Sequence, residues 1–147
     1  NLVLYVILII AVIQDFKSLK VSNRLILTGL GLSLIFRFMT GGLQNLVWAL
    51  PNIAFPVIIL YLFYLVHAIG AGDIKLFSVV GAYVFTYELI NIMSLAFLFG
   101  GVIGASKMAF RRVFADNYDG EIVCIHFSVA IWLAHMTHIL GVYIWKS

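Results

Sequence analysis

Six apolar runs, each separated from the next by a short polar cluster, constrain this chain more than any other feature. They make up most of its 147 residues, of which 64% are hydrophobic and 10% charged. A soluble domain is about half apolar and a quarter charged, and a membrane-spanning helix needs roughly 17–25 residues. The sequence therefore predicts an all-α, polytopic membrane protein with about six transmembrane helices in one domain, residues 1–147. The runs extend from Leu2 to about Gln14, Leu25 to about Met39, about Leu46 to Val66, Gly70 to about Tyr87, about Leu89 to Ser106, and Ile122 to about Ile144.

Two of these runs need comment. The first resembles the apolar part of a signal peptide, but no basic segment precedes it and no small-residue cleavage site follows it. We therefore interpret it as the first helix. The third run contains Pro51 and Pro56, so its helix is expected either to kink or to begin late, with Pro51 in its first turn.

Basic residues predict how the chain is oriented. The first, third and fifth connections between runs hold seven lysines and arginines, whereas the other side holds two. Because basic residues concentrate on the cytoplasmic side, the odd-numbered connections are predicted to be cytoplasmic and both termini to face outward. The seven are Lys17, Lys20, Arg24, Lys75, Lys107, Arg111 and Arg112, and the two are Arg37 and Lys146.

Only two carboxylates occur in the first 87 residues, Asp15 and Asp73. Asp15 ends the first run and Asp73 opens the fourth, so both are predicted at the cytoplasmic membrane edge. A carboxylate near hydrocarbon is costly and is therefore a functional candidate. Two carboxylates that approach closely share a proton, because both cannot ionise cheaply. Such a pair can activate water and polarise a carbonyl, as in aspartic proteases, with no metal or cofactor.

Other roles explain the same two acids. Asp15 can be the polar end of a helix, paired with Lys17 or Lys20, and Asp73 can be the N-terminal cap of the fourth helix. A third interpretation is a small proton-coupled transporter that uses both acids as a relay. A peptidase needs the two acids facing each other near one surface, whereas a transporter needs a deeper acid that is reached from both sides.

The residues around both acids resemble those of the type IV prepilin peptidases, which are membrane aspartic proteases of the GxGD group. The segment Gly70-Ala71-Gly72-Asp73-Ile74-Lys75-Leu76 resembles the second-aspartate motif of that family. Asp15 with Val21-Ser22-Asn23 resembles the first-aspartate motif, with Ser22 where proline is usual, so the loop is expected to be less rigid. Residues 125–131 resemble the last helix, with His126 where a proline is usual.

This resemblance implies an aspartic endopeptidase of a prokaryotic cytoplasmic membrane that removes the leader of type IV prepilins on the cytoplasmic side. It implies Asp15 and Asp73 as catalytic residues, supported by Gly70, Gly72, Lys75 and Asn23. The partners would be a prepilin and the lipid bilayer, without nucleic acid, metal or other cofactor. A short, peptidase-only form like those of Flp-type (tight adherence) pili is expected. A GxGD protease for other membrane substrates is the alternative.

A few further residues have open roles. Lys75 either tunes or positions the site or anchors its helix at the interface. His135 and His138 have a spacing that suits a metal, although packing within the bundle is favoured. The single cysteine, Cys124, permits neither an intramolecular disulfide nor a zinc-binding cysteine pair. The acidic segment 116–121 is a solvated loop or attracts a basic leader peptide.

Overall fold

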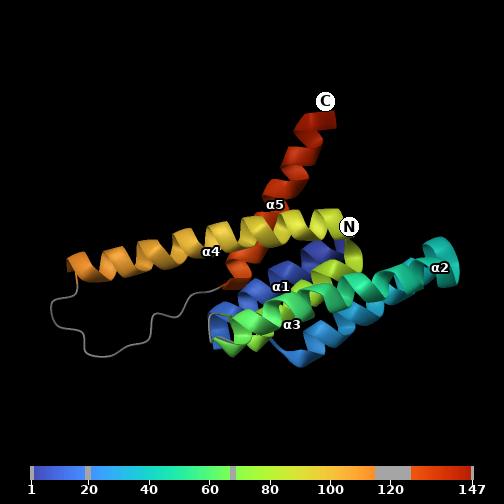
Figure 1. Ribbon diagram of the computed structural model, residues 1–147, viewed down its shortest axis with the longest axis horizontal. Coiled ribbons are helices and arrows are strands. Elements are labelled where there is room, and N and C mark those ends of the chain that lie inside the picture. Colours follow the sequence, from blue (N-terminus) through green and yellow to red (C-terminus); the bar gives the residue numbers. More distant parts are fainter. Residues whose placement is uncertain (1, 19–20, 67–68, 115–126, 147) are drawn as a thin grey trace.

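The computed structural model is built from five helices and describes residues 2–18, 21–66, 69–114 and 127–146 (Figure 1). No strand occurs in these ranges, so the predicted all-α class is confirmed. The helices are α1 (Leu2–Ser18), α2 (Asn23–Leu65), α3 (Ala71–Tyr83), α4 (Thr86–Phe114) and α5 (Phe127–Lys146).

The long element α2 is a helical hairpin. Its backbone leaves the helical region only at Gly41 and Gly42, and Gly42 has φ 61° and ψ −152°. That conformation is open essentially only to glycine, and the ribbon reverses direction there (Figure 1). The two arms of α2 therefore correspond to the second and third predicted runs, and the break lies where the polar cluster predicted it.

The second arm of α2 is helical through both prolines, so of the two expected alternatives, a kink or a late start at Pro51, the late start is wrong. Pro56 has no N–H to donate to the carbonyl of Asn52, one helical turn earlier. Gly81 of α3 packs against this carbonyl so closely that an added Cβ would lie 2.1 Å from the oxygen. The proline thus leaves the Asn52 carbonyl of α2 without its helical N–H donor, and the glycine lets α3 pack closely against this carbonyl.

Several predicted ends of helices differ from the observed ones. Helix α1 continues to Ser18, so Asp15 lies inside a helix, and α3 ends at Tyr83 rather than near Tyr87. The boundary is set locally, because the Phe85 N–H donates to the Glu88 carboxylate at 3.2 Å and begins α4 with half of a capping box. Helix α4 extends past the predicted end at Ser106. The predicted start of the last run, Ile122, lies outside the described residues.

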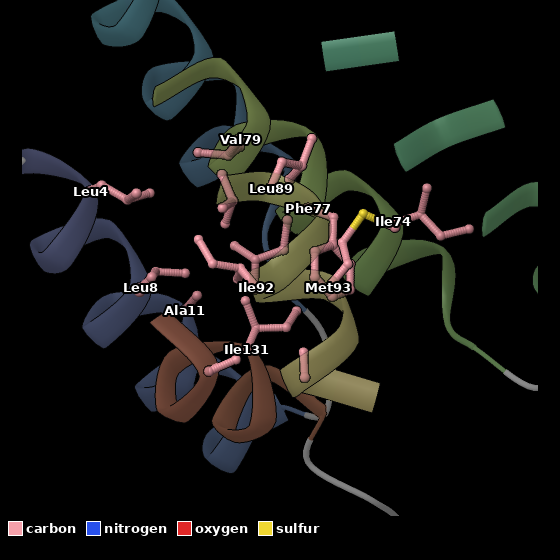
Figure 2. Close-up of a cluster of buried hydrophobic side chains, with 14 of the residues drawn as sticks. Leu4, Leu8, Ala11, Ile74, Phe77, Val79, Leu89, Ile92, Met93 and Ile131 are labelled. Carbon is pink, nitrogen blue, oxygen red and sulfur yellow. The ribbon is translucent and has the colours of Figure 1, made fainter. Parts of the chain in front are cut away.

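Helix α3 forms the centre of the molecule. Every residue from Leu76 to Ala82 is buried, as expected for a helix that is apolar on all sides. Figure 2 shows its side chains meeting those of α1, α4 and α5. The labelled members of this cluster are Leu4, Leu8, Ala11, Ile74, Phe77, Val79, Leu89, Ile92, Met93 and Ile131.

Polar contacts from both arms of α2 fix the C-terminal end of α3. Arg37 of the first arm donates from Nε to the Ala82 carbonyl at 2.7 Å and from a terminal nitrogen to the Val84 carbonyl at 3.0 Å. The Asn52 amide of the second arm also donates to the Val84 carbonyl, at 3.3 Å, and accepts from Thr86 at 2.6 Å. These bonds satisfy carbonyl groups that a helix end leaves without partners.

The outer surface is strongly apolar. Large exposed apolar side chains occur on α1, α2, α4 and α5, whereas α3 contributes none. An exposed apolar surface of this extent indicates a membrane environment. The ranges Asn23–Leu65 and Thr86–Ala109 are long and apolar enough to cross a membrane, and Phe127–Val142 is a shorter apolar helix. The count of six spans remains a prediction.

Candidate active site

Asp15 continues the buried face of α1. Leu4, Ile7, Leu8 and Ala11 are buried, and Asp15 follows at the same helical spacing with 9% of its surface exposed. The Ser128 hydroxyl of α5 donates to Asp15 Oδ2 at 2.5 Å. The buried carboxylate therefore has a defined partner from the last helix, 113 residues away in the chain.

Asp73 is the third residue of α3, and the cap position belongs to Gly70, with φ −75° and ψ 147°. The interpretation of Asp73 as the N-terminal cap is therefore wrong. The Asp73 N–H donates to the Gly70 carbonyl at 3.1 Å. A Cβ added to Gly70 would lie 3.2 Å from Asp73 Oδ2, closer than an ordinary contact. Glycine at position 70 thus leaves room for this carboxylate.

The two acids interact across the interior. The Asp15 carboxylate is close enough to that of Asp73 to act on it electrostatically. Asp15 lies in the last turn of α1, next to the connection to α2. Asp73 lies in the first turn of α3, next to the connection from α2. Two neighbouring carboxylates in a mostly buried place can share a proton and act as acid and base.

A hydrogen bond joins the helix that contains Asp73 to the segment that follows Asp15 in the chain. Lys75 Nζ of α3 donates to Asn23 Oδ1, at the start of α2, over 2.9 Å. Gly72 also lies beside this segment, because a Cβ there would be 3.9 Å from the Val21 nitrogen. Of the roles considered for Lys75, the contact favours positioning, because it links the two motifs directly.

Ser22 adopts the backbone conformation of a proline. Its φ of −69° and ψ of 138° lie in the region to which a proline ring restricts a residue. Its N–H donates to Gln14 Oε1 at 2.9 Å, and its hydroxyl accepts from the Leu25 N–H at 3.3 Å as the N-terminal cap of α2. These two bonds stabilise Ser22 in this conformation, and the lower rigidity expected of the loop stays a prediction.

A pocket of about 420 Å³ opens beside Asp73. Helices α2, α3, α4 and α5 and the connection before α3 all contribute to its wall. The ring centroid of Phe97 lies 5.6 Å from that of Phe63 and 5.8 Å from that of Phe127, so the wall is largely aromatic. The pocket is lined by Phe63, Ile69, Gly70, Asp73, Phe97, Gly100, Gly101 and Phe127. An apolar side chain bound here would lie next to a carboxylate.

The histidines on α5 do not belong to this arrangement. His135 is 3% exposed and packs against the Tyr5 ring of α1 at 5.5 Å between centroids. Among the described residues, no three His, Cys, Asp or Glu side chains are grouped as metal ligands. His126, Cys124 and the acidic segment 116–121 lie outside the described residues.

Sequence reasoning missed Ser128 and the aromatic pocket. Ser128 stood within the segment that resembled a last helix, but nothing local indicated that its hydroxyl meets Asp15. The pocket could not be predicted either, because its phenylalanines come from three different helices. A polar residue within the apolar segment 127–131 was the one available signal.

Comparison with known proteins places the two motifs within a matched family model. A family model described as the type IV leader peptidase family matches residues 2–105. The match includes α1, α2, α3 and most of α4, and with them both acids and the segments beside them. Searches of curated proteins and of solved structures gave no significant match.

Proposed function

Because the chain belongs to the type IV leader peptidase family, we propose that it is a membrane aspartic endopeptidase that cleaves the leader from type IV prepilins. Asp15 and Asp73 are its catalytic residues in this proposal. The observation that carries it is that both acids lie at the start of α5: Phe127 lines the pocket together with Asp73, and the next residue, Ser128, donates to Asp15.

The reaction needs one ionised and one protonated carboxyl group. The ionised carboxylate takes a proton from water as the water oxygen bonds to the carbonyl carbon, and the protonated carboxyl gives its proton to the carbonyl oxygen. When the tetrahedral intermediate collapses, the C–N bond breaks. The proton held by the first carboxyl passes to the leaving nitrogen, and the second carboxyl recovers a proton from the intermediate. The products are a carboxylic acid and an amine, and the pair returns to its starting state.

The pocket suits a substrate with an apolar side chain beside the scissile bond. Its aromatic wall binds apolar groups, and Asp73 lies at its edge. A prepilin carries a basic leader before an apolar helix, so the residue that begins the helix would enter this pocket. The leader would remain at the cytoplasmic membrane edge, where the basic residues of the chain predict the site to be.

The subtype and the topology belong to the same proposal. We take the protein to be a six-span member that acts on Flp-type prepilins in a prokaryotic cytoplasmic membrane. The hairpin form of α2 supports this topology, because its two arms together with α1, α3, α4 and α5 make six helical segments.

The deciding experiment replaces each acid by its near-isosteric amide. Asp15→Asn and Asp73→Asn should each lower the cleavage rate by roughly a hundred- to ten-thousandfold, because an amide cannot exchange the proton. The measurement is the leader-sized mass shift of a synthetic prepilin segment incubated with the detergent-purified protein. Far-UV circular dichroism and size-exclusion chromatography check that each variant folds.

Combining the variants provides a second criterion. Residues that act as a unit are non-additive, so the double variant should be no slower than either single variant. Near-normal turnover in either Asn variant would overturn the assignment of the catalytic pair. Proton-coupled uptake into vesicles that both Asn variants abolish, without any peptide cleavage by the wild type, would favour the transporter.

A further inference from the structure

The two acids of the site have different surroundings. Asp73 lines the pocket, whereas Asp15 is buried against the first turn of α5. Ser128, which is 0% exposed, donates its hydroxyl proton to Asp15 Oδ2 over 2.5 Å. This distance is typical of a hydroxyl donating to an ionised carboxylate.

Packing fixes the position of the Ser128 hydroxyl. The adjacent Phe127 ring contacts the Phe77 ring at 6.2 Å and the Phe97 ring at 5.8 Å between centroids. It also lies over Gly100, where an added Cβ would approach Phe127 Cε2 to 2.4 Å. Helices α3 and α4 therefore hold the start of α5, and the hydroxyl is aimed at Asp15 by the fold.

We propose that Ser128 is a positioning residue that keeps Asp15 ionised, which makes Asp15 the general base and Asp73 the proton donor of the cleavage reaction. This inference rests on the proposed peptidase function. A hydroxyl that donates to a carboxylate favours its charged form. With Ser128 donating to Asp15, the Asp15 carboxylate is the member of the pair that takes the proton from water, and the proton of the pair resides on Asp73.

Several other described titratable groups have contacts or exposure of their own. Among the described titratable groups, Asp73 of α3 acts on Asp15 electrostatically and favours the sharing of one proton. Lys75 of α3 donates to Asn23 of α2, and Arg24 beside it is exposed. His135 of α5 packs against Tyr5.

The test compares Ser128→Ala with Ser128→Thr in the cleavage assay as a function of pH. The alanine variant should lower kcat/KM by roughly ten- to a hundredfold, in line with the loss of a hydrogen bond to a charged group. Its acidic limb should also move to higher pH, because the ionised form of the general base loses a stabilising bond. The threonine variant keeps the hydroxyl and should keep the acidic limb of the wild type.

A matched control separates this effect from the loss of any buried hydroxyl. Ser33 is 1% exposed and donates to the Leu30 carbonyl of its own helix. Ser33→Ala should leave the acidic limb where it is. If Ser128→Ala does not accumulate, Ser128→Cys takes its place, since a thiol is a weaker donor and should move the limb in the same direction by less.

The outcomes distinguish this inference from the function on which it rests. An acidic limb that stays unchanged in the Ser128 variants, while both Asp→Asn variants are inactive, overturns the positioning role alone. Normal cleavage by an Asp→Asn variant overturns the catalytic pair itself, whatever Ser128 does. A shifted limb in the alanine variant, restored by threonine and absent in Ser33→Ala, supports the positioning role.

Discussion

Ser22 stands where the related motif has proline, yet its backbone already has the dihedral angles of a proline. Ser22→Pro would therefore fit the fold and would restrict the unfolded chain, which is worth about 0.4–1 kcal/mol. It would remove the N–H bond to Gln14 and the cap of α2, and a lost cap alone costs about 1 kcal/mol.

We predict that Ser22→Pro lowers the free energy of unfolding by about 1 kcal/mol, because the two lost bonds outweigh the entropy gain. Thermal unfolding in detergent measures it, and Ser22→Ala, which loses the cap but keeps the N–H, should be destabilised by about the same amount. A melting temperature above that of the wild type would mean that the two bonds contribute little.

Lys75 and Asn23 should act as a pair. Removing either partner of their hydrogen bond is expected to lower kcat/KM a few-fold, in line with about 0.5–1.5 kcal/mol for such a bond. Asn23→Ala combined with Lys75→Met should be no worse than either alone, since interacting residues are non-additive. Asn23→Ala combined with Tyr87→Ala, at an exposed position near the start of α4, should be additive. Full activity of Asn23→Ala would contradict the positioning role and would favour the alternative, in which Lys75 anchors its helix at the membrane interface.

At the scale of elements, neighbouring glycines of α4 have different roles. Gly100 lies under the Phe127 ring, whereas a Cβ at Gly101 would meet nothing within 4 Å. Gly101 lines the pocket, so a side chain there would project into space that a substrate needs. Gly141 of α5 is equally open but is not part of the pocket wall.

Gly101→Leu should therefore raise KM for the prepilin segment by roughly tenfold or more, in line with about 1.5–3 kcal/mol for the burial of one apolar side chain. The kcat value should change less than KM, because the two acids are untouched. Gly141→Leu places the same side chain on an open surface and should leave KM unchanged. Equal kinetics for the two leucine variants would show that the substrate does not use the pocket.

At the scale of the whole molecule, the site and the polar contacts of Arg37 lie at opposite ends of α3. Asp73 is in the first turn of this helix, and Arg37 binds carbonyls at its last turn. The site is thus near one end of the central helix, and the hairpin of α2 carries the chain away from this end and back (Figure 1). This arrangement agrees with a site near one membrane surface.

Labelling tests the predicted orientation. In a Cys124→Ser background, a cysteine at Tyr118 should resist an impermeant thiol reagent in intact cells, because the fifth connection is predicted to be cytoplasmic. A cysteine at Leu43, an exposed residue beside the hairpin of α2, should react readily. The opposite pattern would reverse the orientation and, with it, the side on which cleavage occurs.

The sequence by itself determined the helical segments and the residues with unusual chemistry. Apolar runs predict helices because a helix hydrogen-bonds the backbone N–H and C=O groups that lipid cannot satisfy, and the Gly41–Gly42 break follows from local dihedral freedom. Asp15 and Asp73 stood out because charge is costly beside hydrocarbon. All of these arguments use residues that are close together in the chain.

Only the tertiary structure decided which side chains meet. The contacts between Ser128 and Asp15 and between Lys75 and Asn23 join residues 113 and 52 positions apart, and the pocket combines residues from four helices. Such contacts depend on which faces of the helices pack together and how closely. One example is the close approach of Gly81 in α3 to the Asn52 carbonyl of α2. Periodicity in the sequence indicates that a helix face is buried, but the packing of neighbouring helices determines what that face contacts.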